Sequence, residues 1–245
     1  MLTKSKAPID LPRKFVSTIH MPHEHLKFAI LASDVALFTL KEDALYVRMM
    51  RVNRPPHFHN APGLLGGLIL PKETAEEATE RLVEAKGGIR ASRIYIEQLA
   101  TFSAINRDPR GRVIAVAYMA LASWESLSPE EQKDTLALWW QPLSKVPRLA
   151  YDHNEILRTA RERLCAKSQY TSIVQKLLPK TFTLSELERA EELLAGRPID
   201  KRNFRKKLAK LGLLTPTGER TEGSAHRPAA LYRFKSQTVA HTELL

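Results

Sequence analysis

The stretch from Gly66 to Ile89 constrains the fold of this chain most, because glycines and charged residues recur in it at fixed intervals. It starts with Gly66-Gly67, has Glu73 six residues later and Arg81 eight residues after that, and ends on Gly88-Ile89. Residues 72–86 have the composition of a strongly acidic helix. A coincidental surface helix would account for that acidity, but not for glycines, a Glu and an Arg in one register. We therefore expect an acidic helix over residues 72–86 with glycines at fixed positions before and after it.

Strand patterns surround this helix. Residues 27–52 contain two apolar runs on either side of Lys41-Glu42-Asp43, which predicts a hairpin. Residues 93–102 and 113–122 are rich in β-branched and aromatic residues and predict two more strands. Ser128-Pro129-Glu130-Glu131 has the cap signals of another helix start. Several strands with few helices predict an α+β domain that has an antiparallel component.

From about Tyr151 the pattern becomes helical. Residues 154–168 have apolar positions at helical spacing, and a capping box from Thr183 to Glu186 begins a second helix that Gly196 ends. Asp200 can cap a third helix, which runs to Gly212. Residues 213–217 and 230–234 predict two short strands around a polar loop. A helix-turn-helix followed by a hairpin is a winged helix.

The third of these helices is strongly basic. Residues 201–210 hold six Lys/Arg and no acid, and Phe204, Leu208 and Leu211 fall on one side of the helix. The apolar side can dock on the preceding helix while the basic side faces outward, as a DNA recognition helix requires, although basic runs are more often solvated surface. RNA is less favoured because the basic side lacks aromatic residues. The candidate DNA-binding residues are Lys201, Arg202, Asn203, Arg205, Lys206, Lys207, Lys210, Arg220, His226 and Arg227.

Net charge agrees with a polyanionic partner. The formal charge is +11, and residues 151–245 carry 18 Lys/Arg against 11 Asp/Glu. The single cysteine, Cys165, fits a reducing compartment, and neither a secretory signal nor an apolar run long enough for a membrane span is present. We expect a cytoplasmic protein without a membrane partner.

The stretch from Gly66 to Ile89 resembles the motif of the Nudix hydrolases, G-x5-E-x7-R-E-U-x-E-E-x-G-U, in which U is a bulky aliphatic residue. In that family, glutamates on one helix face bind Mg²⁺ or Mn²⁺ against the diphosphate of the substrate. Here Leu82, Ala85 and Lys86 stand at the three carboxylate positions that follow Arg81. These positions share one helix face, and a lysine stands where a dication would bind. The resemblance therefore implies a pocket for a diphosphate with no metal site and no efficient catalysis, with residual hydrolysis left open.

Most of the chain, from about residue 26 to 235, resembles the Nudix-related transcriptional regulators of NAD metabolism, the NrtR family. The most specific matching segments are 97–121, 149–157, FTLSELE, DKRNFRKK and HRPAALYRF. The resemblance implies an α+β protein with an N-terminal Nudix-like α/β/α sandwich with a mixed sheet and a C-terminal winged helix-turn-helix. It further implies a homodimer on a palindromic double-stranded operator near NAD biosynthesis or salvage genes. ADP-ribose would relieve repression, and no cofactor would be required. The family's W-A-L-P-G-G falls on residues 62–67, where tryptophan and proline are lost, which leaves ligand affinity and identity open.

The expected domains are an N-terminal extension (1–25), a Nudix-like ligand-binding domain (26–148), a winged helix-turn-helix DNA-binding domain (149–237) and a tail (238–245). Guanidinium groups and exposed backbone N–H groups suit phosphate oxygens, and the family places a hairpin at the ligand. The candidate ligand-binding residues are Arg51, Gly66, Gly67, Glu73, Arg81, Phe102, Arg107, Asp108, Arg110 and Arg112.

Two alternatives stay open at this point. The first is an active Nudix pyrophosphatase for ADP-ribose or a nucleotide sugar, with an accessory winged-helix domain. The second is a protein-interaction module without DNA binding. The pairs His23-x-His25 and His57-x-His59 lack the accompanying cysteines or helical spacing of a zinc site, and Trp139-Trp140 are interpreted as core or interface residues.

Overall fold

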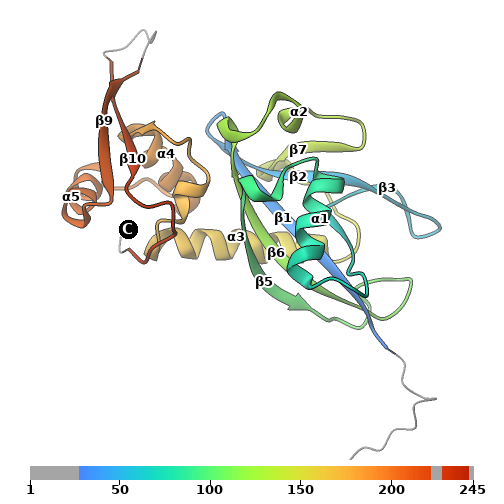
Figure 1. Cartoon of the computed structure of the whole chain (residues 1–245). Helices are drawn as coiled ribbons and strands as arrows, with labels where there is room; N and C mark the ends of the chain where they lie inside the picture. The colour runs from blue at the N-terminus through green and yellow to red at the C-terminus, as the bar shows by residue number, and fades with distance from the viewer. Residues whose placement is uncertain (1–27, 222–227, 243–245) are drawn as a thin grey trace, which may run out of the picture.

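The computed structural model describes residues 28–221 and 228–242 (Figure 1). Ten strands and five α-helices, joined by short 3₁₀ turns, follow the chain within these ranges. The first ten are β1 (Ile30–Lys41), β2 (Ala44–Arg54), β3 (Phe58–Gly63), β4 (Leu65–Leu68), α1 (Ala75–Gly87), β5 (Tyr95–Phe102), β6 (Val113–Ser123), α2 (Pro129–Gln132), β7 (Leu138–Pro142) and α3 (His153–Tyr170). The last five are β8 (Phe182–Thr183), α4 (Leu184–Ala195), α5 (Lys201–Leu211), β9 (Leu214–Arg220) and β10 (Ala230–Phe234).

The first seven strands form one mixed sheet in the order β3-β2-β1-β6-β5, with β4 paired to β1 and β7 paired to β2. β1 and β6 run parallel over their whole length, and the other pairs are antiparallel. The two-residue turn of the β1–β2 hairpin holds Glu42 and Asp43 at positive φ. The hairpin expected at this position and the α+β class are confirmed.

Helices cover both faces of this sheet, as an α/β/α sandwich requires (Figure 1). Alternate residues of β1 point to opposite faces, so that Val35 and Leu37 pack beneath α1 with Val83. The residues that alternate with them, Ala36 and Phe38, pack with the α3 side chains. The central strands are therefore buried on both faces and read as nearly continuous apolar runs.

Local cap chemistry sets the ends of α1. Thr74 and Glu77 form a reciprocal capping box, and Gly88 ends the helix in the left-handed conformation at φ 68°. The helix therefore begins at Ala75, three residues later than the sequence predicted. The capping box at Ser128 is also present, but the helix after it has only four residues.

The winged helix expected in the C-terminal half is confirmed. β8, β10 and β9 form a three-stranded sheet beside α4 and α5. Thr183 and Glu186 form the predicted capping box, and Gly196 and Gly212 end the two helices at positive φ. The predicted apolar face of α5 was wrong at one position. Phe204 and Leu208 are buried, but Leu211 is 41% exposed because it occupies the last position of the helix.

α3 joins the two halves of the chain (Figure 1). Its buried residues Ile156, Ala160 and Leu164 belong to one hydrophobic core that includes Phe38 of the mixed sheet and Phe234 of the winged helix. Because α3 packs against both halves of the chain, the boundary between the halves lies along this helix. Among the residues that the structure describes, no helix has the length and apolar character needed to cross a membrane.

Candidate functional site

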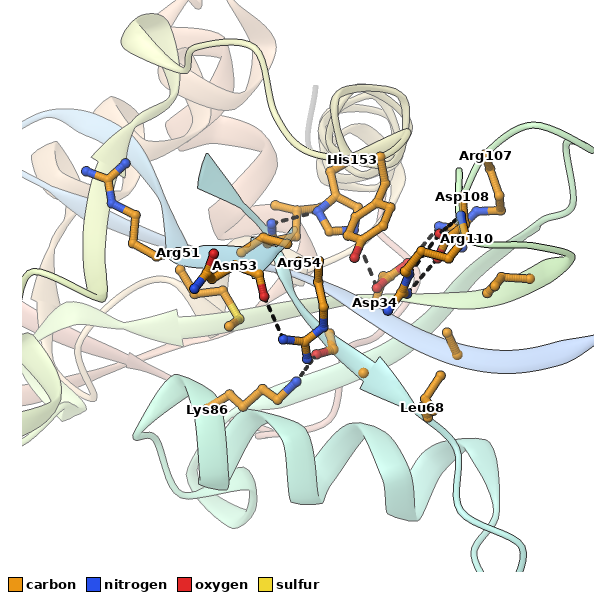
Figure 2. Close-up of a pocket in the computed structure, with 18 residues that line it drawn as sticks. Asp34, Arg51, Asn53, Arg54, Leu68, Lys86, Arg107, Asp108, Arg110 and His153 are labelled. Atoms are coloured by element: carbon orange, nitrogen blue, oxygen red, sulfur yellow. Dashed lines mark hydrogen bonds and ion pairs between the residues drawn. The ribbon is translucent and has the colours of Figure 1, made fainter. Parts of the chain in front are cut away.

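A pocket opens between β2, the β3–β4 segment, the C-terminal end of α1 and the start of α3 (Figure 2). Five cationic side chains line it, against the two carboxylates of Asp34 and Asp108. The cationic residues are Arg51, Arg54, Lys86, Arg107 and Arg110. The excess of positive charge suits an anionic ligand.

The glycine pair forms one wall of the pocket and leaves little room for a side chain. A Cβ on Gly66 would lie 2.2 Å from Asp34 Oδ1, and one on Gly67 would lie 2.7 Å from Leu82 and 3.0 Å from Lys86 Nζ. Both residues belong to β4, which pairs with β1. The glycines therefore let the backbone approach the pocket and α1 closely.

A buried ion-pair network forms the floor. Arg107 donates to both carboxylate oxygens of Asp152, at 2.8 and 2.7 Å, and to Asp34 Oδ2 at 2.8 Å. His153 Nδ1 accepts from the backbone N–H of Leu64 at 3.0 Å, and its Nε2 lies 3.5 Å from Asp34. Burial alone would raise the pKa of Asp34, but the contacts with His153 and Arg107 lower it below its ordinary value. The network ties the pocket to the first turn of α3.

Arg110 and Asp108 form a second pair at the rim. Arg110 binds both oxygens of Asp108, at 2.9 and 2.7 Å, and its guanidinium lies 5.5 Å from the Tyr151 ring. Burial would raise the pKa of Asp108, but the hydrogen bonds from Arg110 lower it. The stacked guanidinium and Tyr151 offer a flat apolar and cationic surface at the mouth of the pocket.

The Glu73–Arg81 pair of the motif lies outside the pocket. Arg81 Nε donates to Glu73 at 2.8 Å, and its second nitrogen donates to the Leu68 carbonyl at 3.0 Å. The hydrogen bond from Arg81 lowers the pKa of Glu73 to about 2. This pair fastens the loop before α1 to the end of β4.

Lys86 occupies the end of α1 that faces the pocket. Its ammonium donates to the Gly66 carbonyl at 2.6 Å. Burial lowers the pKa of Lys86, and the charges of Arg54 and Arg81 lower it further.

The residues of α1 do not fit the divalent cation that the Nudix motif implies. Leu82 is buried, Ala85 has no donor atom, and Glu84 accepts from the backbone N–H of Ala91 instead of facing the pocket. Within residues 28–221 and 228–242, His, Cys, Asp and Glu side chains do not gather in any group of three that could hold a metal ion. A hard cation would find too few oxygen ligands here.

The structure brings six of the ten candidate ligand residues together in the pocket: Arg51, Gly66, Gly67, Arg107, Asp108 and Arg110. The other four lie apart from it. Phe102 packs with Ala32, Val113 and Ala115, and Arg112 donates to the carbonyls of Ser103 and Ala104. Glu73 and Arg81 brace the loop.

Sequence reasoning did not name the six other polar residues of the pocket as ligand candidates: Asp34, Asn53, Arg54, Lys86, Tyr151 and His153. Tyr151 and His153 lie within the segment 149–157 that carried the resemblance, which was an available signal. Asp34 reads as an interruption of an apolar strand and gives no spacing signal.

The basic face of α5 is exposed. Asp200 caps the helix by accepting from the backbone N–H groups of Arg202 and Asn203, both at 3.1 Å. The side chains of Lys201, Arg202, Asn203, Lys206 and Lys210 are exposed, while Lys207 is half-buried. Such a face can contact phosphates and base edges together.

Two of the other candidate DNA-binding positions have protein partners. Arg205 is bonded through two nitrogens to the buried Glu188 of α4, at 2.5 and 3.2 Å. Arg220, at the end of β9, donates to the Pro228 carbonyl at 3.0 Å. His226 and Arg227 lie outside the described residues.

Comparisons with known proteins find similar proteins for both halves of the chain. Residues 174–234 match the family described as the NrtR DNA-binding winged helix domain. The chain is 31% identical over 212 residues to the "ADPR responsive transcriptional repressor NtrR" of Acinetobacter baylyi, which covers 85% of this chain and 83% of that relative.

Two solved structures are similar in fold and sequence. Shewanella oneidensis NrtR complexed with a 27mer DNA is 34% identical with a TM-score of 0.74, over 84% of this chain and 93% of that one. The NUDIX domain of the same protein complexed with ADP ribose is 33% identical with a TM-score of 0.50, over 59% of this chain and 94% of that one. The protein described above, a mixed-sheet domain of Nudix type joined by α3 to a winged helix, therefore belongs to the NrtR family.

Proposed function

We propose that this protein is a DNA-binding transcriptional repressor and that ADP-ribose, bound in the pocket of the mixed-sheet domain, releases it from its operator. The regulated genes would be those of NAD biosynthesis or salvage. The binding unit would be a homodimer on a palindromic site, because a two-fold protein matches two half-sites related by the same symmetry.

The observation that carries the proposal is the two-sided character of α5. Phe204 and Leu208 are buried against the rest of the winged helix, while Lys206 and Lys210 are exposed on the opposite side. A helix placed second in a helix-turn-helix and cationic on its free face has the position and charge to enter a major groove.

The pocket supports the effector half. Its cationic lining suits a diphosphate, and the Arg107–Asp152 bond connects the pocket to α3, which packs against α4. ADP-ribose would act by binding the DNA-free arrangement more tightly than the DNA-bound one. A tenfold shift in DNA affinity requires a difference of about 1.4 kcal/mol between the two.

A regulatory role without efficient hydrolysis is the function that α1 supports best. The side chains at its pocket end, Ala85 and Lys86, provide neither metal ligands nor a general base. Metal-dependent release of AMP from ADP-ribose at enzyme-like speed would instead favour the alternative of an active pyrophosphatase.

The proposal is tested by selecting bound fragments from random duplex DNA and titrating the selected duplex by fluorescence anisotropy. We expect a palindromic site whose affinity falls steeply with salt, with a slope of about 0.9 per phosphate contact. ADP-ribose should weaken binding about tenfold. An unchanged anisotropy at millimolar ADP-ribose would reject the effector half, and absence of any selected duplex would reject the DNA half.

A further inference from the structure

Lys86 contacts the backbone of the glycine pair at the wall of the pocket. Its ammonium donates to the Gly66 carbonyl at 2.6 Å and lies over Gly67, where a Cβ would approach it to 3.0 Å. Carbonyl oxygens of this kind are also ligands for hard divalent ions. The side chain thus places a fixed positive charge beside the glycine pair, on the wall of the pocket.

Arg54 brings a second positive charge to the same point. Figure 2 shows Arg54 reaching from β2 toward Lys86, which rises from α1. Within the described residues, neither side chain has a carboxylate within the 4.0 Å of an ion pair, and Arg54 donates only to the Asn53 carbonyl. Asp34, whose negative charge acts on Lys86, is already engaged by Arg107.

Two cations that converge without a counterion repel one another. An anion with two charged groups would relieve it, since each phosphate can accept a charge-assisted hydrogen bond. A dication at the same place would add to the repulsion. The local charges therefore favour a diphosphate and oppose a metal ion.

We infer that Lys86 and Arg54 bind the diphosphate of the ligand directly and take the place of a divalent cation, so that this protein binds a nucleoside diphosphate without metal. This rests on the proposed function, because ADP-ribose is the diphosphate that the proposal places in the pocket. The replacement also accounts for the loss of the α1 carboxylates: Lys86 supplies the charge that binding needs but no metal to activate water.

Isothermal titration of the full-length protein with ADP-ribose, in buffer with EDTA and in buffer with Mg²⁺, tests the inference. The wild-type dissociation constant should agree within about twofold between the two buffers. Lys86→Met and Arg54→Met should each weaken binding about tenfold in EDTA, or about 1.4 kcal/mol, because each removes a charge-assisted hydrogen bond. Lys72→Met, an exposed lysine in the turn before α1, is the matched control and should bind as wild type.

A gain-of-metal variant sharpens the test. The double variant Ala85→Glu and Lys86→Glu restores two carboxylates to the pocket face of α1, and its binding should depend on Mg²⁺. Wild-type binding that requires Mg²⁺ would overturn the inference. So would wild-type affinity in both Lys86→Met and Arg54→Met. Thermal melting of each variant shows whether it is folded.

Inorganic pyrophosphate separates this inference from the proposed function. If ADP-ribose fails to bind in either buffer but pyrophosphate binds in EDTA and is weakened by Lys86→Met, the cation pair stands and the effector assignment fails. If pyrophosphate also fails to bind, the cation pair is rejected.

Discussion

At the scale of single residues, Glu191 is an ionisable side chain that is fully buried in the protein. Both of its carboxylate oxygens are buried in α4 without a hydrogen-bond partner among the described residues. Burial raises its pKa from 4.5 to about 8. A charge in this position would be costly, so the folded protein holds the carboxyl in its neutral form through neutral pH.

This raised pKa predicts a stability that falls with rising pH. The unfolded chain releases the Glu191 proton near pH 4.5 while the folded chain keeps it to about pH 8. The contribution of Glu191 to the free energy of unfolding is therefore fully present below about pH 4.5 and is lost as the pH rises toward 8. Glu191→Gln should remove this loss, worth about 2–4 kcal/mol.

Urea denaturation at pH 5 and pH 8 measures the effect. The difference between Glu191→Gln and wild type should grow at the higher pH. The exposed Glu130→Gln serves as the control and should follow wild type at both values. Equal pH dependence in wild type and Glu191→Gln would show that the carboxyl is ionised in the folded protein.

At the scale of elements, α5 has two functions on two faces. Arg205 holds the buried Glu188 of α4, whereas Lys206, one position along, is exposed. Both are cationic residues of one helix, and the sequence alone treats them alike. The structure divides them into a residue that fixes α5 on α4 and a residue available to DNA.

We therefore expect Arg205→Ala and Lys206→Ala to separate in stability. Arg205→Ala leaves Glu188 buried with only Lys201 nearby, at 4.0 Å, and should lower the free energy of unfolding by about 1–3 kcal/mol. Lys206→Ala should leave stability within about 0.5 kcal/mol and lower the salt slope of DNA binding by about one phosphate contact. Denaturant melts and anisotropy titrations at several salt concentrations distinguish them. Wild-type stability of Arg205→Ala would contradict the role of Arg205 in fixing α5 on α4.

At the scale of the whole molecule, α3 packs the two halves of the chain around one hydrophobic core. Leu164 is fully buried in a core that runs from Phe38 of the mixed sheet to Phe234 of the winged helix. Arg189 of α4 also lies 3.6 Å from Asp43 in the β1–β2 turn. Unfolding either half would expose the apolar surface of the other.

Calorimetry should therefore show a single thermal transition whose calorimetric and van't Hoff enthalpies agree. Leu164→Ala should lower the stability of that one transition by about 2–5 kcal/mol, since it opens a cavity in the shared core. Arg161→Ala, on the exposed side of α3, should change it little. Two separate transitions in the wild type would contradict the shared core.

Features that depend on neighbours in the chain could be predicted. The capping boxes at Ser128 and Thr183, the Asp200 cap and the β1–β2 hairpin rest on contacts within a few residues, and all were expected. The strands β3, β4, β7 and β8 were not expected. β4 contains Gly66-Gly67 and is a strand only because β1 provides its hydrogen-bond partners.

The sequence by itself determined the helix-turn-helix with its hairpin, the basic face of α5 and the loss of carboxylates at the end of α1, because helical periodicity and cap chemistry act over a few residues. Only the tertiary structure decided the pocket. It brings Arg107 to Asp34, 73 positions away, Asp152 to Arg107, 45 positions away, and Lys86 to the Gly66 carbonyl. Such contacts depend on how strands and helices pack across the whole sheet, which no local pattern specifies.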